Sequence, residues 1–239
     1  MSSTAIDLRH SRRVGAAICV VAVPALVGAI TALAPNYNSD SAKIVIPAYR
    51  AHLADARVEI ALALLVTLLV PIFVFGLYRL VARRVPVLAA VGGLLALAGW
   101  VLLPFVTAMD VLAYDLAVHG GDPAIWNAFS GSGAVAVAAV IFALGHEIGT
   151  LLLGVALWRT RAVSRWAAGA VMLGDVLHLI AHVGGVRALD LAGLALLTLG
   201  CLAVARAIVR TADDEWDLPP VVAASQDSAR NSSLASTAP

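Results

Sequence analysis

Residues 166–186, with the sequence WAAGAVMLGDVLHLIAHVGGV, decide the fold of this chain. A helix needs about twenty apolar residues to cross a bilayer. Lipid offers no hydrogen-bond partners, so such a segment must satisfy its own backbone and is therefore a helix. The run nonetheless contains Asp175, His178 and His182. Ionisable groups in hydrocarbon are costly, so these three are candidates for a function.

The same kind of apolar run recurs along the chain. The predicted spans cover residues 14–34, 57–78, 85–109, 132–158, 164–184 and 190–209. The chain has 239 residues, of which 61% are hydrophobic and only 13% charged, whereas an ordinary soluble domain is about a quarter charged. We therefore predict an all-α fold, a polytopic membrane bundle of six transmembrane helices over residues 14–209, with the lipid bilayer as its surroundings.

The composition also limits the partners and the source. A net charge of +1 does not favour nucleic-acid binding. One Lys against fifteen Arg, with abundant Ala, Val and Leu, is typical of a GC-rich, actinobacteria-like genome. The cysteines Cys19 and Cys201 lie inside apolar runs, where we expect two small buried residues rather than a disulfide.

The basic residues predict the orientation. Twelve of the 16 Lys and Arg residues fall on one side of the predicted membrane, at both termini and in the second and fourth loops. Because cytoplasmic loops carry the excess of basic residues, both termini should be cytoplasmic, in a bacterial inner (plasma) membrane. One alternative is that the first span is a cleaved signal peptide ending at Ala32-Leu33-Ala34.

The sequence also predicts the character of the segments outside the spans. Residues 1–13 form a cytoplasmic N-terminus, and residues 210–239 form a disordered cytoplasmic tail. The acidic part of this tail, residues 213–217, is a candidate contact for a cytoplasmic partner. In the outer loop, Asp122-Pro123 predicts the start of a short helix that carries Trp126 and Phe129.

Further ionisable residues interrupt the other spans. His52, Asp55 and Glu59 follow the i, i+3, i+7 spacing of one helix face, provided that a helix begins near Pro47. The depth of each residue in its span predicts one polar pocket that opens to the outside and narrows toward the midplane. Its predicted members are Glu59, Asp110, His146, Glu147, Asp175, His178 and His182. Gly145-x-x-x-Gly149 brackets the His-Glu pair, and such spacing allows helices to approach closely.

Two cofactor hypotheses follow from the histidines. His178 and His182, at i and i+4, can chelate one ion, and Glu59 or Asp110 could add a carboxylate. Three such ligands and a water form the pattern of catalytic zinc, so zinc or another divalent metal is the first hypothesis. Haem is the weaker one, with His146 facing His178 or His182 as axial ligands.

Several functions remain open at this point. The leading hypothesis is binding or passage of a small cation or proton-linked solute through the pocket, because Asp, Glu and His chains are common components of such paths. The alternatives are a metal-dependent intramembrane hydrolase that uses His178 and His182, and a non-catalytic membrane scaffold or sensor component. Histidine–carboxylate pairs that only join helices would give the same pattern. Catalytic residues and any homo-oligomer stay undefined.

Two stretches carry a resemblance to known proteins. Residues 142–161, FALGHEIGTLLLGVALWRTR, and 163–175, VSRWAAGAVMLGD, resemble a bacterial domain-of-unknown-function family of six-helix integral membrane proteins. The resemblance implies a membrane location and six helices, but no activity, and it does not extend to His178 and His182. The pair His178-x-x-x-His182 alone is similar to the zinc site of seven-helix membrane hydrolases.

Overall fold

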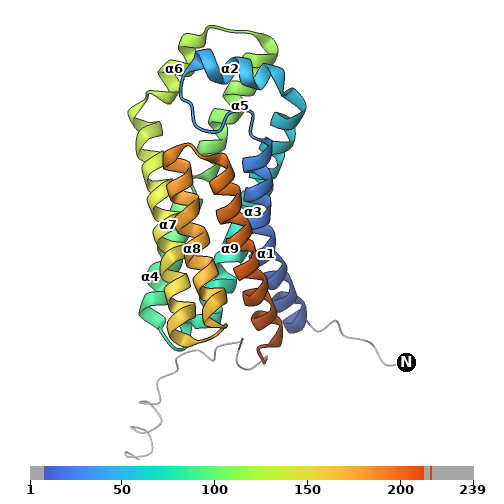
Figure 1. The fold of residues 1–239 in the computed structure, drawn as a ribbon, viewed down its shortest axis with the longest axis vertical. Coiled ribbons are helices and arrows are strands. Elements are labelled where there is room, and N and C mark those ends of the chain that lie inside the picture. Colours follow the sequence, from blue (N-terminus) through green and yellow to red (C-terminus); the bar gives the residue numbers. More distant parts are fainter. Residues whose placement is uncertain (1–7, 213–215, 217–239) are drawn as a thin grey trace, which may run out of the picture.

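The structure is a computed structural model that describes residues 8–212 and 216. Within these residues it contains α-helices and no strand. The helices are α1 (Leu8–Leu33), α2 (Ala42–Ala51), α3 (Leu53–Ala82), α4 (Pro86–Trp100), α5 (Leu103–His119), α6 (Pro123–Ser130), α7 (Gly133–Thr160), α8 (Arg165–Gly184) and α9 (Arg187–Arg210). Figure 1 shows the long helices side by side. The predicted all-α bundle is confirmed.

Six segments of the described chain are long and apolar enough to cross a membrane. Helices α1, α3, α7, α8 and α9 supply one segment each, and α4 and α5 together form the remaining one, Pro86–His119, which is the third span along the chain. The outer surface of the bundle carries large apolar side chains, among them Leu68, Val87 and Val183, each more than 70% exposed. An apolar exterior of this extent needs a lipid environment, so the chain is a multi-pass membrane protein.

The third span is longer than predicted and is broken. The sequence placed its end at Met109, whereas α5 continues to His119. The break lies at residues 101–102, and α5 begins after it with Leu103 and Pro104. Proline has no N–H to donate, and its ring clashes with the carbonyl four residues earlier, which here belongs to Trp100. Asp110 therefore lies in the middle of α5 and not at the end of a span.

Helices α2 and α6 lie across one end of the bundle, which we call the capped end (Figure 1). The other end holds the start of α1 and the end of α9, and we call it the terminal end. The expectation of one helix from Pro47 through Glu59 was wrong, because His52 leaves the helical conformation and separates α2 from α3. Asp122 caps α6 by accepting from the Ala124 N–H, which confirms the predicted start of this helix.

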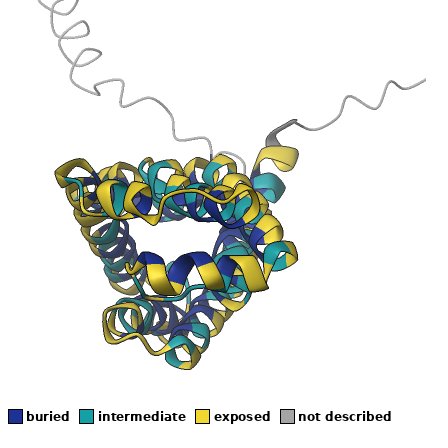
Figure 2. Cartoon of the chain, turned by 90° about the horizontal axis from the view of Figure 1, so that it is seen from above, coloured by how far each residue is buried: buried dark blue, intermediate teal, exposed yellow. Residues whose placement is uncertain are grey.

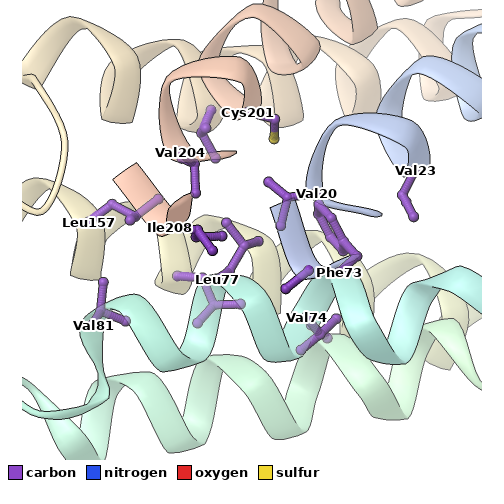
Figure 3. Packing of buried hydrophobic residues seen from close by; sticks show 14 of the residues in the cluster. Val20, Val23, Phe73, Val74, Leu77, Val81, Leu157, Cys201, Val204 and Ile208 are labelled. Atoms are coloured by element: carbon purple, nitrogen blue, oxygen red, sulfur yellow. The ribbon is translucent and has the colours of Figure 1, made fainter. Parts of the chain in front are cut away.

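The core lies between α1, α3, α4, α7, α8 and α9. Figure 3 shows Val20, Leu77, Val204 and Ile208 directed toward one another, and all four are fully buried. Seen from above, the buried residues face the interior of the bundle and the exposed residues face outward (Figure 2). Cys201 belongs to this core, and both cysteines are free and buried, as predicted.

Glycines allow two helix pairs to pack closely. A Cβ atom on Gly99 of α4 would lie 2.2 Å from the backbone nitrogen of His146 in α7. Likewise, a Cβ atom on Gly174 of α8 would lie 2.6 Å from the backbone nitrogen of Leu197 in α9. Real Cβ atoms do not make contacts this short, so only glycine permits these two crossings. The first crossing sets the position of His146, and the second sets the spacing of the helices that carry His178 and Asp190.

The two predicted terminal segments lie mostly outside the described residues. Within them, residues 8–13 are the first turns of α1. Trp216 is 5% exposed, and its ring packs edge-on against Phe75 with ring centroids 6.3 Å apart. The prediction of disorder for the rest of the tail concerns residues 213–215 and 217–239, outside the described part.

Candidate metal centre

Helix α7 supplies two adjacent buried side chains to the interior of the bundle. His146 and Glu147 are 6% and 5% exposed. The Nδ1 of His146 donates to the backbone carbonyl of Phe142, one turn earlier. This hydrogen bond fixes the proton of the neutral ring on Nδ1 and leaves Nε2 as an acceptor. That Nε2 lies 3.3 Å from Glu147 Oε1.

His178 reaches the same place from α8. Its Nδ1 donates to Asp190 Oδ1, at the start of α9. Asp190 is 1% exposed and also accepts a 2.8 Å hydrogen bond from the Tyr37 hydroxyl through its other oxygen. Burial and this contact with Asp190 raise the pKa of Tyr37, so its hydroxyl stays protonated and donates. The Nε2 of His178 is then directed to Glu147 Oε1, at 3.8 Å.

Three acceptor atoms therefore converge from α7 and α8. One ring nitrogen of His146, one of His178 and a carboxylate oxygen of Glu147 all lie within 4.8 Å of one another. A tetrahedral zinc ion with ligand bonds of about 2.0–2.1 Å holds its ligand atoms about 3.3 Å apart. The observed contacts of 3.3 and 3.8 Å are close to this geometry. Both histidines also donate Nδ1–H to a carbonyl or a carboxylate, as metal-binding histidines usually do.

A small cavity of about 20 Å³ adjoins these ligands. Trp100, Thr150 and Asp175 contribute to its wall, together with apolar residues of α1, α3 and α9. A space of this size holds one water molecule. The indole Nε1 of Trp100 is buried and has no hydrogen-bond partner among the described residues, which favours a polar occupant. Asp175 is 3% exposed and interacts with Glu147, so a second carboxyl group faces this region.

A row of imidazoles links the centre to the outside of the bundle. The ring centroids of His146 and His178 are 6.2 Å apart, and those of His178 and His182 are 6.3 Å apart. Exposure rises along the row, because His146 is buried, His178 is partly buried and His182 is exposed. His182 contacts the ring of Tyr37 in an edge-on geometry at 5.8 Å. The row therefore runs from the interior toward the capped end, where α8 meets α9 (Figure 1).

A second polar cluster lies beneath α2. The Tyr49 hydroxyl is 2.7 Å from Asp110 Oδ1 and 3.4 Å from Glu59 Oε2. Burial and the two neighbouring carboxylates raise the pKa of Tyr49, so its hydroxyl remains a donor. His52 and Asp55 do not join this cluster but pair with each other at the surface, with Nδ1 and Oδ2 3.5 Å apart.

The seven residues predicted to line one pocket thus fall into two groups. His146, Glu147, Asp175, His178 and His182 gather between α7 and α8, whereas Glu59 and Asp110 gather around Tyr49. The carboxylate that faces His178 is that of Glu147, and Glu59 is hydrogen-bonded elsewhere. The sequence analysis also missed Tyr37, Tyr49 and Asp190. A carboxylate at the start of the sixth span was visible, but it was treated only as a span boundary.

No family model matches this chain, and neither a curated protein nor a solved structure is significantly similar to it.

Proposed function

We propose that this multi-pass membrane protein binds one divalent transition-metal ion inside its helix bundle, at His146, Glu147 and His178. One observation carries the proposal. The Nδ1 hydrogen bonds of the two histidines leave both Nε2 atoms as acceptors, 3.3 and 3.8 Å from the same carboxylate oxygen of Glu147. Three acceptors at this distance repel one another unless a cation lies between them. Two imidazoles and a carboxylate form a donor set that suits zinc.

The balance of charge in the site supports a cation. Glu147, Asp175 and Asp190 are all at least 95% buried. In the described part of the chain, none of them forms an ion pair with Lys or Arg. Buried carboxylates need a positive partner or a proton. Protonation of one histidine would also supply a positive partner for these carboxylates, so a proton is the main competitor of the metal ion.

The row of imidazoles favours exchange of the cation with the outside. We infer that His182 and Tyr37 form the entrance and that Asp175 lies at the inner end, which agrees with an outward-facing site for binding or passage of a small cation. The cavity of about 20 Å³ has room for one water molecule beside the three side chains, but for neither a haem macrocycle nor a peptide substrate. This size ranks the haem and hydrolase hypotheses below cation binding.

The excess of Arg at the terminal end supports a cytoplasmic location of both termini, in a bacterial inner membrane. Membership in the six-helix bacterial family stays a proposal that rests on residues 142–175. A cytoplasmic partner of the acidic residues 213–217 and a homo-oligomer stay proposals as well.

Zinc titration of the purified protein tests the metal site. The protein is reconstituted in nanodiscs, stripped with a chelator and titrated in competition with a chromophoric zinc indicator. We expect one zinc ion per chain, and we expect His178→Ala and Glu147→Gln each to weaken binding by more than about 100-fold. The matched control is His119→Ala, which removes an exposed histidine that also pairs with a carboxylate, Asp115.

The outcomes separate metal from proton. Binding of one zinc ion that is lost in both variants and kept in the control supports the proposal. A wild-type protein that takes up neither zinc nor cobalt would overturn it in favour of a protonated histidine pair. Equal zinc binding by His119→Ala, His178→Ala and wild type would show that the metal lies elsewhere.

A further inference from the structure

The terminal end of the bundle carries a concave basic site. A pocket of about 420 Å³ lies between the end of α3, the turn from α7 to α8 and the end of α9. It is lined by six arginines, which are Arg79, Arg83, Arg84, Arg161, Arg206 and Arg210. We call it the basic pocket. Loops with an excess of Arg explain the sign of the charge at this end, but not why six guanidinium groups surround one hollow.

Within the described residues, the arginines of the basic pocket retain free donor capacity. Arg79 donates to the backbone carbonyl of Trp216, while its buried Nε has no hydrogen-bond partner among the described residues. Arg84 donates to the Thr160 carbonyl. Arg83, Arg161, Arg206 and Arg210 are exposed. Guanidinium groups bind phosphate oxygens through paired N–H donors, which makes a phosphate group the best match for this pocket.

An apolar groove continues from the basic pocket along the membrane-facing side. It has a volume of about 600 Å³ and runs between α1 and α9. Val14, Ile18 and Val21 line one wall, and Val209 lines the other. The groove and the basic pocket share Arg206 and Arg210. The two hollows therefore adjoin at these arginines, with apolar side chains along the groove and positive charge in the basic pocket.

We propose that the basic pocket and the apolar groove together bind one anionic phospholipid. The phosphate lies against Arg206 and Arg210, and one acyl chain lies along α1 and α9. Both ends of this ligand are matched, because burial of the chain is favourable and basic pockets between transmembrane helices bind anionic headgroups. A free phosphate would fill only the pocket, and a neutral lipid would fill only the groove.

An acidic segment follows the basic pocket in the sequence. The acidic residues Asp213, Asp214, Glu215 and Asp217 follow Thr211, which lines the pocket. A segment of this kind would compete for the same guanidinium groups. A variant with all four residues changed to Asn or Gln, with Trp216 kept, tests this competition without removing the buried indole.

Thermal unfolding of the delipidated, detergent-purified protein tests the proposal. Dioleoyl phosphatidylglycerol is the probe, and dioleoyl phosphatidylcholine and inorganic phosphate are the reference ligands. We expect saturating phosphatidylglycerol to raise the unfolding midpoint by about 5 °C or more. Arg206→Gln/Arg210→Gln should lose this rise. The matched control, Arg12→Gln/Arg159→Gln, removes two exposed charges at the same end but outside the basic pocket, and should keep it.

A second variant keeps all the charges. Ile18 is 62% exposed in the groove, so Ile18→Trp should fill the groove without disturbing the core, and it should also lose the rise. An equal rise with phosphatidylcholine or with inorganic phosphate alone would overturn the lipid assignment. So would an equal loss in the control variant, or a rise that occurs only when the acidic segment is neutralised.

Discussion

Asp190→Asn is the sharpest single perturbation of the metal centre. The substitution keeps the shape of the side chain, leaves an oxygen that can accept from His178 Nδ1, and removes one buried negative charge. Because Asp190 touches His178 but is not one of the three converging ligands, it should act on the metal through that imidazole, by orienting it and raising its basicity. The substitution also replaces the oxygen that accepts from the Tyr37 hydroxyl with an amide NH2.

The magnitude follows from this indirect role. Loss of a carboxylate that supports a metal-binding histidine usually weakens metal affinity by about 10- to 100-fold, or about 1.4–2.8 kcal/mol. Asp190 is 1% exposed, so solvent screens its charge little, and the upper half of this range is expected. Removal of the ligand itself, in His178→Ala, should have a larger effect.

Competition with a chromophoric chelator at pH 7 measures these affinities. The matched control is Asp115→Asn, the same substitution at a carboxylate that is 65% exposed and lies 3.7 Å from His119. We expect the control to bind zinc like the wild type. Wild-type affinity in Asp190→Asn, or equal weakening in Asp190→Asn and Asp115→Asn, would refute the assigned role of Asp190.

Three further predictions concern packing and pH. Gly99→Val should lower both the unfolding midpoint and the zinc affinity, because its Cβ would lie 2.2 Å from the backbone nitrogen of His146. The control Gly15→Ala, whose Cβ meets nothing within 4 Å, should change neither. Unaltered zinc binding in Gly99→Val would contradict the predicted link between this helix crossing and the metal site. Zinc affinity should fall as the pH is lowered from 7 to 5, because imidazoles and carboxylates bind the metal only when deprotonated; an affinity independent of pH would exclude histidine ligands. The raised pKa of Tyr49 means that the fold favours the neutral phenol, so its stabilising contribution is complete below the unfolded pKa of about 10 and is lost as the pH rises above it. Tyr49→Phe should therefore show a smaller decrease of the unfolding midpoint between pH 9 and 11, and an unchanged decrease would contradict the role of Tyr49.

The spans could be predicted because hydrocarbon imposes a length and a composition on each of them. The same reasoning gave the wrong end for the third span. Its apolar character fades near Asp110, but the buried contacts of Ala113 and Leu116 with α2 keep α5 helical to His119. Tertiary packing decides where such a helix ends, and a hydropathy profile carries no information about tertiary packing.

The sequence predicts how deep each site residue lies in the membrane, but not which residues contact one another. The position of a residue in its span gives its height in the membrane, which is why His146, Asp175 and His178 were expected to lie together. Height does not tell which helices are neighbours or how each is rotated. Glu59 was therefore assigned to the histidines, although Tyr49 of α2 holds it near Asp110. Asp190 was overlooked because its partner, His178, lies across the turn from α8 to α9.

X-ray absorption at the zinc edge of the zinc-loaded protein tests the central claim most directly. The claim predicts a first shell of nitrogen and oxygen at about 2.0–2.1 Å, with the outer-shell scattering of two imidazoles in the wild type, one in His146→Ala and two in the control His119→Ala. A wild-type spectrum without imidazole scattering, or one that His146→Ala leaves unchanged, would contradict the assignment of the metal to this centre.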